Sequence, residues 1–153
     1  MNIFKLIFLI FMILNFQISK SNDLDKLRKS YLNASKSKQN CIDFLTLTNN
    51  TKFQDCPTLK AYKISAILIS LKFINNPIKK LKIFKKNTDK LNILIKNNPM
   101  LLEIRLLRYL IQTNSPKYLL YNSNIDEDLK FIRNNVFFEN KKIQNFMFST
   151  TNL

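Results

Sequence analysis

The chain of 153 residues contains no glycine and only four prolines. Glycine is the residue that most readily adopts a positive φ angle, which the tight turns of β-hairpins need. Helices joined by asparagine-rich and proline-marked turns do not need it, because asparagine tolerates the left-handed region next best. We therefore predict an all-α domain of antiparallel helix hairpins, with about five to six helices after a signal peptide.

Residues 1–21 have the pattern of a secretory signal peptide. Lys5 supplies a positive charge, residues 6–14 form an unbroken apolar run, and Ser19 and Ser21 are small residues at the spacing of a cleavage site. The apolar run is short for crossing a bilayer. We predict cleavage after Ser21, a mature chain that starts at Asn22, and a periplasmic or secreted location. The alternative is an uncleaved anchor.

Apolar residues at helical spacing predict a helical domain over residues 22–139. Asn22 and Ser37 are placed to cap the first two helices, and Asn124 with Glu127 three positions later has the spacing of a capping box. Prolines stand at three further helix starts, where a missing N–H costs no hydrogen bond: Pro57, Pro77 and Pro99. Residues 140–153 are basic and aromatic without a clear period, so we predict a frayed C-terminal tail.

The absence of histidine removes the usual general base, the usual zinc ligand and every triad that needs imidazole. The absence of glycine removes any glycine-rich phosphate loop. The acidic run Asp126, Glu127 and Asp128 opens a predicted helix, where carboxylates favour the helix dipole. We predict a protein that is not an enzyme, with no metal site and no cofactor.

Residues 99–113 predict a helix that is apolar almost all the way round, and its polar residues form the best candidate site. Arg105, Arg108 and Gln112 fall on one narrow stripe, while Glu103 lies on another face. Two guanidiniums one turn apart can clamp a carboxylate or a phosphate.

We favour an internal network over an open anion site. In this network the arginines pair with Asp126 or Asp128 of the following helix. Shielded charge needs a partner, and these acids lie a short connector away. For Glu103 we expect a different partner, such as a tyrosine hydroxyl or a lysine.

The formal charge of the chain is +15, and lysines gather on one predicted helix. Lys79, Lys82, Lys86 and Lys90 lie opposite an apolar stripe predicted to be buried, which consists of Leu81, Phe84, Leu91 and Ile95. The lysine face can meet anionic lipid or lipopolysaccharide phosphates, or can simply be solvated. Nucleic acid is disfavoured as the partner of an exported chain.

Cys41 and Cys56 are the only cysteines. Export to an oxidising compartment favours a disulfide between them. The alternative is a pair of free buried thiols, because spacing alone does not establish bonding geometry.

A tyrosine-containing helix, an Asn-Pro break, a lysine-rich helix and the stretch over residues 98–133 follow one another along the chain. Together they resemble a family of small exported helical proteins from Bacteroidetes-type bacteria. The residues that match are Tyr62, Asn76, Pro77, Pro99, Glu103, Arg105, Arg108, Gln112, Pro116, Tyr121, Asn122 and Asp128. The resemblance covers residues 57–133 and implies a tetratricopeptide-like helical fold, but no activity.

Two features depart from that family. Leu120 stands where such sequences often have glycine, so the turn there is expected to differ, and the cysteine pair is not a family feature. The leading functional hypothesis is a non-enzymatic helical interaction module of the cell envelope with a protein partner. The alternative is a peripheral binder of anionic envelope surfaces through the lysine face.

Overall fold

The computed structural model describes residues 3–50 and 56–151, with side chains at residues 5–8, 10, 22–50 and 56–151. This part of the chain is all helical, as predicted, and contains no strand. The α-helices are α1 (Ile3–Ala34), α2 (Lys38–Asn50), α3 (Pro57–Ser70), α4 (Pro77–Asn97), α5 (Leu102–Asn114), α6 (Ile125–Asn135) and α7 (Lys141–Thr150). Short 3-10 helices are η1 (Leu71–Phe73), η2 (Lys117–Leu119) and η3 (Val136–Phe138). There are more helices than the sequence predicted.

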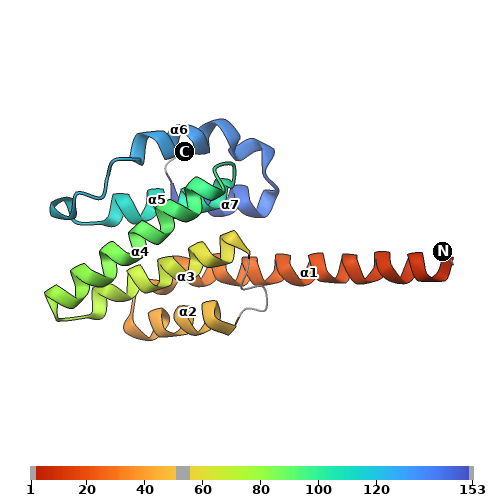
Figure 1. Ribbon diagram of the computed structural model, residues 1–153, viewed down its shortest axis with the longest axis horizontal. Coiled ribbons are helices and arrows are strands. Elements are labelled where there is room, and N and C mark those ends of the chain that lie inside the picture. The colour runs from red at the N-terminus through yellow and green to blue at the C-terminus, as the bar shows by residue number, and fades with distance from the viewer. Residues whose placement is uncertain (1–2, 51–55, 152–153) are drawn as a thin grey trace.

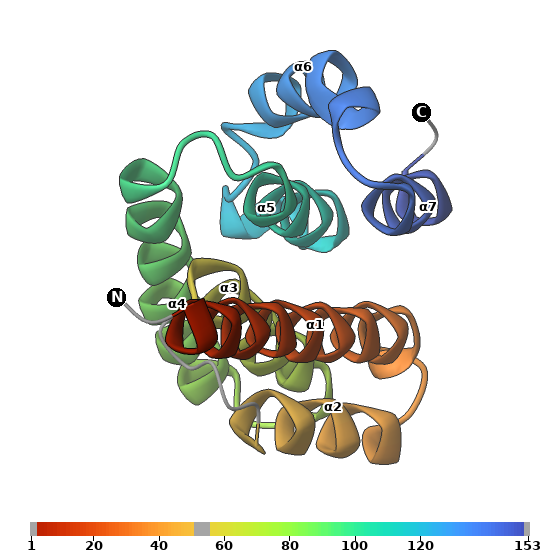
Figure 2. The same cartoon turned by 90° about the vertical axis from the view of Figure 1, so that its right-hand side faces the viewer.

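Consecutive α-helices run in alternating directions, and they form two groups (Figures 1 and 2). Helices α1, α2 and α3 form one group, α5, α6 and α7 form the other, and α4 packs against the side of α3. Helix α3 contacts α1, α2, α4 and α5. It is central because it is apolar on most of its faces, and such a helix is stable only when neighbours cover it.

An aromatic cluster joins four of the helices. Tyr31 of α1 lies edge-on to Phe44 of α2, Tyr62 of α3 and Phe146 of α7, with ring centroids 5.9, 6.1 and 6.0 Å away. Edge-to-face pairs are worth about 0.5–1.5 kcal/mol beyond the area they bury. Phe146 and Met147 are buried, so the predicted frayed tail is wrong for residues 141–150: they form α7 and close the core.

Several predicted helix starts differ from those observed. Ser37 caps α2 by accepting from the Asn40 N–H at 3.1 Å, as predicted. In the full chain, α1 continues through Asn22, where the mature chain was predicted to begin. Helix α5 begins at Leu102 and not at Pro99, because the Leu101 N–H bonds back to Asn98 and closes a separate turn.

The predicted capping box also differs. The side chain of Asn124 makes no cap hydrogen bond; instead its amide donates to the Glu127 carboxylate at 3.2 Å. The two residues therefore interact with each other rather than with the free N–H groups of α6.

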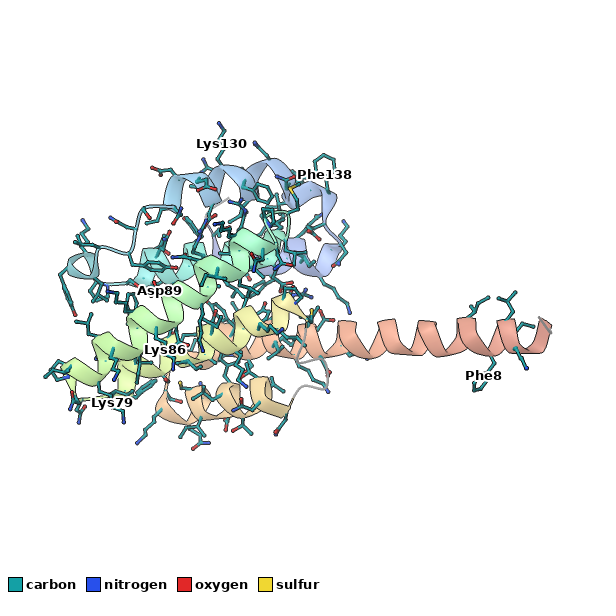
Figure 3. All side chains as sticks on the ribbon, viewed as in Figure 1. Phe8, Lys79, Lys86, Asp89, Lys130 and Phe138 are labelled. Atoms are coloured by element: carbon teal, nitrogen blue, oxygen red, sulfur yellow. The ribbon has the colours of Figure 1, made fainter. Side chains whose placement is uncertain are left out.

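The first half of α1 projects beyond the rest of the molecule (Figure 1). Leu6, Ile7, Phe8 and Ile10 are exposed there, and Phe8 is labelled in Figure 3. Across the described residues, no helix combines the length and apolar character that a membrane span requires.

Leu120 has φ 51° and ψ 32°, and it alone among the described residues has a positive φ. A left-handed conformation costs a residue with a Cβ about 1–2 kcal/mol. The side chain is 82% exposed, so burial does not repay this cost. The adjacent Tyr121 holds the turn in place: its ring meets Phe84 of α4 at 5.7 Å and its hydroxyl donates to Asn92 at 3.0 Å.

Candidate functional site

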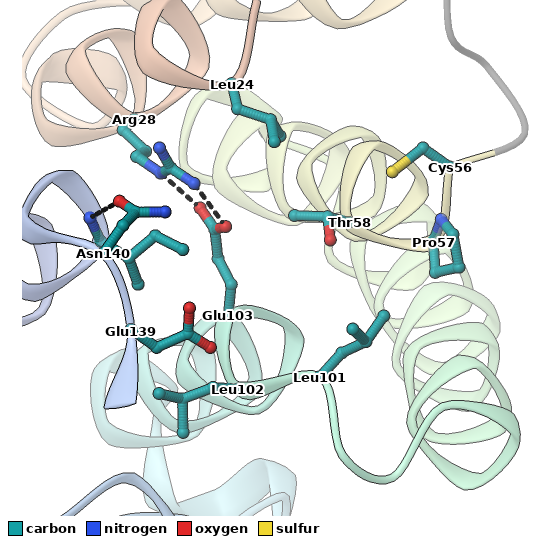
Figure 4. Close-up of a pocket in the computed structure, with 11 residues that line it drawn as sticks. Leu24, Arg28, Cys56, Pro57, Thr58, Leu101, Leu102, Glu103, Glu139 and Asn140 are labelled. Carbon is teal, nitrogen blue, oxygen red and sulfur yellow. Dashed lines mark hydrogen bonds and ion pairs between the residues drawn. The ribbon is translucent and has the colours of Figure 1, made fainter. Parts of the chain in front are cut away.

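A cavity of about 420 Å³ lies between α1, the first turns of α3 and α5, and the residues that lead into α7 (Figure 4). Leu24, Leu102 and Ile143 give it apolar walls. Arg28, Glu103 and Glu139 bring three charged groups to it. Glu103 was a predicted site residue, whereas Arg28 and Glu139 were not among the predicted site residues.

The Arg28 guanidinium makes two parallel hydrogen bonds to Glu103. Arg28 Nε lies 2.8 Å from Oε1, and Nη2 lies 2.8 Å from Oε2. The Tyr62 hydroxyl donates to the same Oε1 at 2.6 Å. All three side chains are buried. The expected tyrosine partner of Glu103 is present, but the cation that balances its charge is an arginine of α1.

The environment shifts the pKa values of Arg28 and Tyr62 upward. Burial alone would lower the pKa of Arg28, but hydrogen bonds from its N–H groups to Glu103 and the carboxylate charge outweigh burial and raise it. Burial raises the pKa of the Tyr62 hydroxyl well above its ordinary value, and the charge of Glu103 adds to the effect. Arg28 therefore stays charged and Tyr62 stays neutral at physiological pH.

A second carboxylate links this cluster to α7. Arg28 Nη1 donates to Asp25 Oδ1 at 2.8 Å, and Lys142 Nζ donates to Asp25 Oδ2. Burial acts to raise the pKa of Asp25, but the hydrogen bonds and charges of Lys142 and Arg28 together outweigh burial and lower it. Each of the three guanidinium nitrogens of Arg28 thus donates to a carboxylate.

Glu139 is the remaining charged group, and its carboxylate has no hydrogen-bond or ion-pair partner among the described residues. Figure 4 shows it on the cavity wall beside Glu103 and Leu102. Burial raises its pKa, the negative charge of Glu103 raises it further, and the charge of Arg28 acts in the opposite direction.

The predicted polar stripe is a closed ion-pair network. Arg108 Nε and Nη2 bind the two oxygens of Asp128 at 2.6 and 2.7 Å, and Asp128 is fully buried. Arg105 Nη1 reaches Glu127 at 2.9 Å and Asp128 at 3.1 Å, and its guanidinium carbon lies 4.4 Å from the Phe131 ring centroid. Asp126, the other candidate acid, is exposed. With a carboxylate for each arginine, this geometry favours a structural network over an open anion site.

Gln112 lies at the end of the same stripe. Its amide donates to Asn124 at 3.4 Å, and its Oε1 is buried without a hydrogen-bond partner. The predicted set of Arg105, Arg108, Gln112 and Asp128 is therefore brought together, while Glu103 belongs to the separate cluster at the cavity.

Helix α4 presents the four predicted lysines to solvent. Figure 3 shows Lys79 and Lys86 along this helix, with Asp89 on the same element. In the described part of the chain, none of the four has an ion-pair partner. Three large apolar side chains of α4 are also exposed: Ile78 and Ile93, at 82% and 59%, lie within or beside the lysine face, while Leu81, at 55%, lies on the opposite side. The predicted burial of Leu81 is wrong. Leu81 lies on the same side of α4 as Phe84, Leu91 and Ile95, but the buried residues of α4 begin only at Asn87, so the first turns of the helix extend beyond the core.

Cys41 and Cys56 carry free thiols, so the predicted disulfide is absent. Cys41 lies in the first turn of α2, whereas Cys56 immediately precedes α3 and its side chain makes no cap hydrogen bond. In the antiparallel pair, the start of α3 with Cys56 follows the end of α2 at Asn50. Cys41 lies nine residues before Asn50, which is about 13 Å away along the helix. Bonded cysteines require Cα atoms within about 7 Å, which antiparallel helices do not allow for opposite ends of a hairpin.

No cluster of three or more cysteine and acidic residues suited to a metal ion occurs within the described ranges. Comparisons with protein-family models, with curated proteins and with solved structures found no match to this chain.

Proposed function

We propose that this protein is a non-enzymatic helical module of the cell envelope that docks on anionic surfaces through α4. The observation that carries the proposal is the exposed side of this helix, where four lysines without acidic partners in the described chain lie beside the exposed Ile78 and Ile93. A basic helix face with apolar side chains is the composition that binds the interface of an anionic membrane, because charge attracts it and apolar groups insert.

Export is part of this proposal. The apolar first half of α1 extends away from the helical groups and exposes Leu6, Ile7, Phe8 and Ile10 (Figure 1). A segment of this kind supports recognition as a signal peptide, followed by cleavage after Ser21. The antiparallel order of successive helices likewise supports the proposed tetratricopeptide-like architecture.

The experiment compares two variants of the full chain in co-sedimentation with vesicles rich in phosphatidylglycerol. One variant replaces Lys79, Lys82, Lys86 and Lys90 by glutamine. The matched control likewise replaces four exposed lysines of other helices by glutamine: Lys29, Lys38, Lys130 and Lys141. Both variants lose the same net charge and keep the same N-terminal segment, so a difference between them reports the position of the charges.

Each lysine near an anionic surface contributes about 1 kcal/mol, so the α4 variant should partition roughly 1,000-fold more weakly than the wild type. The control should retain most of the binding. Raising the salt concentration should release the wild type, because the Debye length falls from about 10 Å at 0.1 M to 3 Å at 1 M. Equal loss in both variants would contradict docking through α4.

A protein partner is the second candidate, and a different observation favours it. Phe137 and Phe138 of η3 are 72% and 88% exposed, and the Phe137 ring lies 6.1 Å from that of Phe148 on α7. Exposed aromatic groups of this kind are enriched at protein interfaces. Under this alternative, replacing Phe138 by serine would abolish capture of a partner from envelope extract, and the α4 variant would not.

A further inference from the structure

The cavity beside Glu139 has an excess of negative charge in a strongly basic chain. Arg28 and Lys142 are the positive groups of the cluster, and Asp25, Glu103 and Glu139 are the negative ones. Asp25 and Glu103 share the two cations. The Glu139 carboxylate is therefore left as the uncompensated charge.

The charges and apolar walls of the cavity suit some classes of ligand better than others. An anion would be repelled by Glu139 and would find Arg28 already donating from all three nitrogens to carboxylates. A hard metal ion requires several oxygen ligands, but Glu139 offers one carboxylate on a wall shared with Leu102 and Ile143. A cation with an apolar body satisfies both parts of the lining, because its charge pairs with Glu139 while its carbon atoms leave water.

We propose that this cavity binds a small organic ammonium ion, with the charged nitrogen at Glu139 and the aliphatic body against Leu24, Leu102 and Ile143. Its volume of about 420 Å³ lies within the range of small-molecule sites, about 300–1,000 Å³. The cavity involves none of the α4 residues, so this binding is independent of the proposed docking surface.

The test titrates 1-aminopentane into the full chain and follows the methyl NMR signals of Ile143 and Leu24. Pentanol and pentanoate serve as neutral and anionic probes of the same length. We expect saturable shifts with the amine and much weaker effects with the other two probes. Glu139→Gln should weaken amine binding about 10- to 100-fold, the range for a hydrogen bond to a charged group.

The matched control is Asp126→Asn, which removes the same charge from an exposed position at the start of α6. It should leave amine binding unchanged, as should the α4 lysine variant. Binding should weaken as the pH falls through the pKa of Glu139, which lies above its ordinary value of 4.5. Equal affinity in wild type and Glu139→Gln, or stronger binding of pentanoate than of the amine, would overturn the proposal.

Discussion

Removing the guanidinium of Arg108 should destabilise the fold strongly. Its two bonds to Asp128, at 2.6 and 2.7 Å, join α5 to α6, and the exposed fractions of the two side chains are 7% and 0%. Breaking a buried pair by removing one partner costs about 3–5 kcal/mol, because the other charge is left uncompensated. Asp128 would keep one bond from Arg105 at 3.1 Å, which reduces the expected cost of Arg108→Ala to about 2–4 kcal/mol.

The assay is urea unfolding of Arg108→Ala, Asp128→Asn and the double variant. The double variant should lose less free energy of unfolding than the sum of the two single variants, with a coupling of about 1–3 kcal/mol. Arg133→Ala is the control, because Arg133 is exposed at the end of α6 and its loss should change stability by no more than about 0.5 kcal/mol.

An unchanged or higher stability of Arg108→Ala would refute the structural network. The arginines would then be an open anion site in which like charges repel. Phosphate or citrate should in that case raise the melting temperature of the wild type and leave that of Arg108→Ala unchanged.

Three further predictions follow from the described geometry and from the N-terminal sequence. Leu120→Gly should raise the free energy of unfolding by about 0.5–1 kcal/mol, because relief of the left-handed strain exceeds the entropy cost of glycine. Urea unfolding measures this change, and a loss of stability would contradict the strain at Leu120. In the native protein Cys56 should react with a thiol reagent before Cys41, because Cys41 is 2% exposed and burial raises the pKa of its thiol. A native protein without free thiols would contradict the separation of the two cysteines. Mass spectrometry of protein made in an exporting bacterial host should find Asn22 as the first residue, and a retained Met1 would exclude cleavage.

The sequence was sufficient to predict side-chain partners where the interacting residues lie close together along the chain. Arg108 and Asp128 are 20 positions apart and separated by one short connector, so the requirement of a buried charge for a partner identified the pair. The lysine face of α4 follows from helical spacing alone. The absence of glycine indicated the all-α class, and Leu120 adopts the left-handed conformation that glycine would take more readily.

The cavity was not predictable in the same way, because its groups come from distant parts of the chain. Arg28 and Glu103 are 75 positions apart, and no local pattern connects α1 to α5. A signal did exist: Arg28 lies between Leu24 and Tyr31 at helical spacing and must therefore share their buried side. Glu139 precedes a segment without a clear apolar period, and only its packing as α7 brings it to the cavity.

Docking through α4 can be measured directly because the chain contains no tryptophan. A single tryptophan placed at Ile78, 82% exposed on α4, becomes the only indole fluorophore of the protein. The comparison variant is Phe138→Trp, at a site 88% exposed and distant from Lys79 in Figure 3. On addition of phosphatidylglycerol vesicles, the emission of Ile78→Trp should shift to shorter wavelength and become protected from an aqueous quencher, while that of Phe138→Trp should not change. A shift confined to Phe138→Trp, or no shift in either variant, would contradict docking through α4.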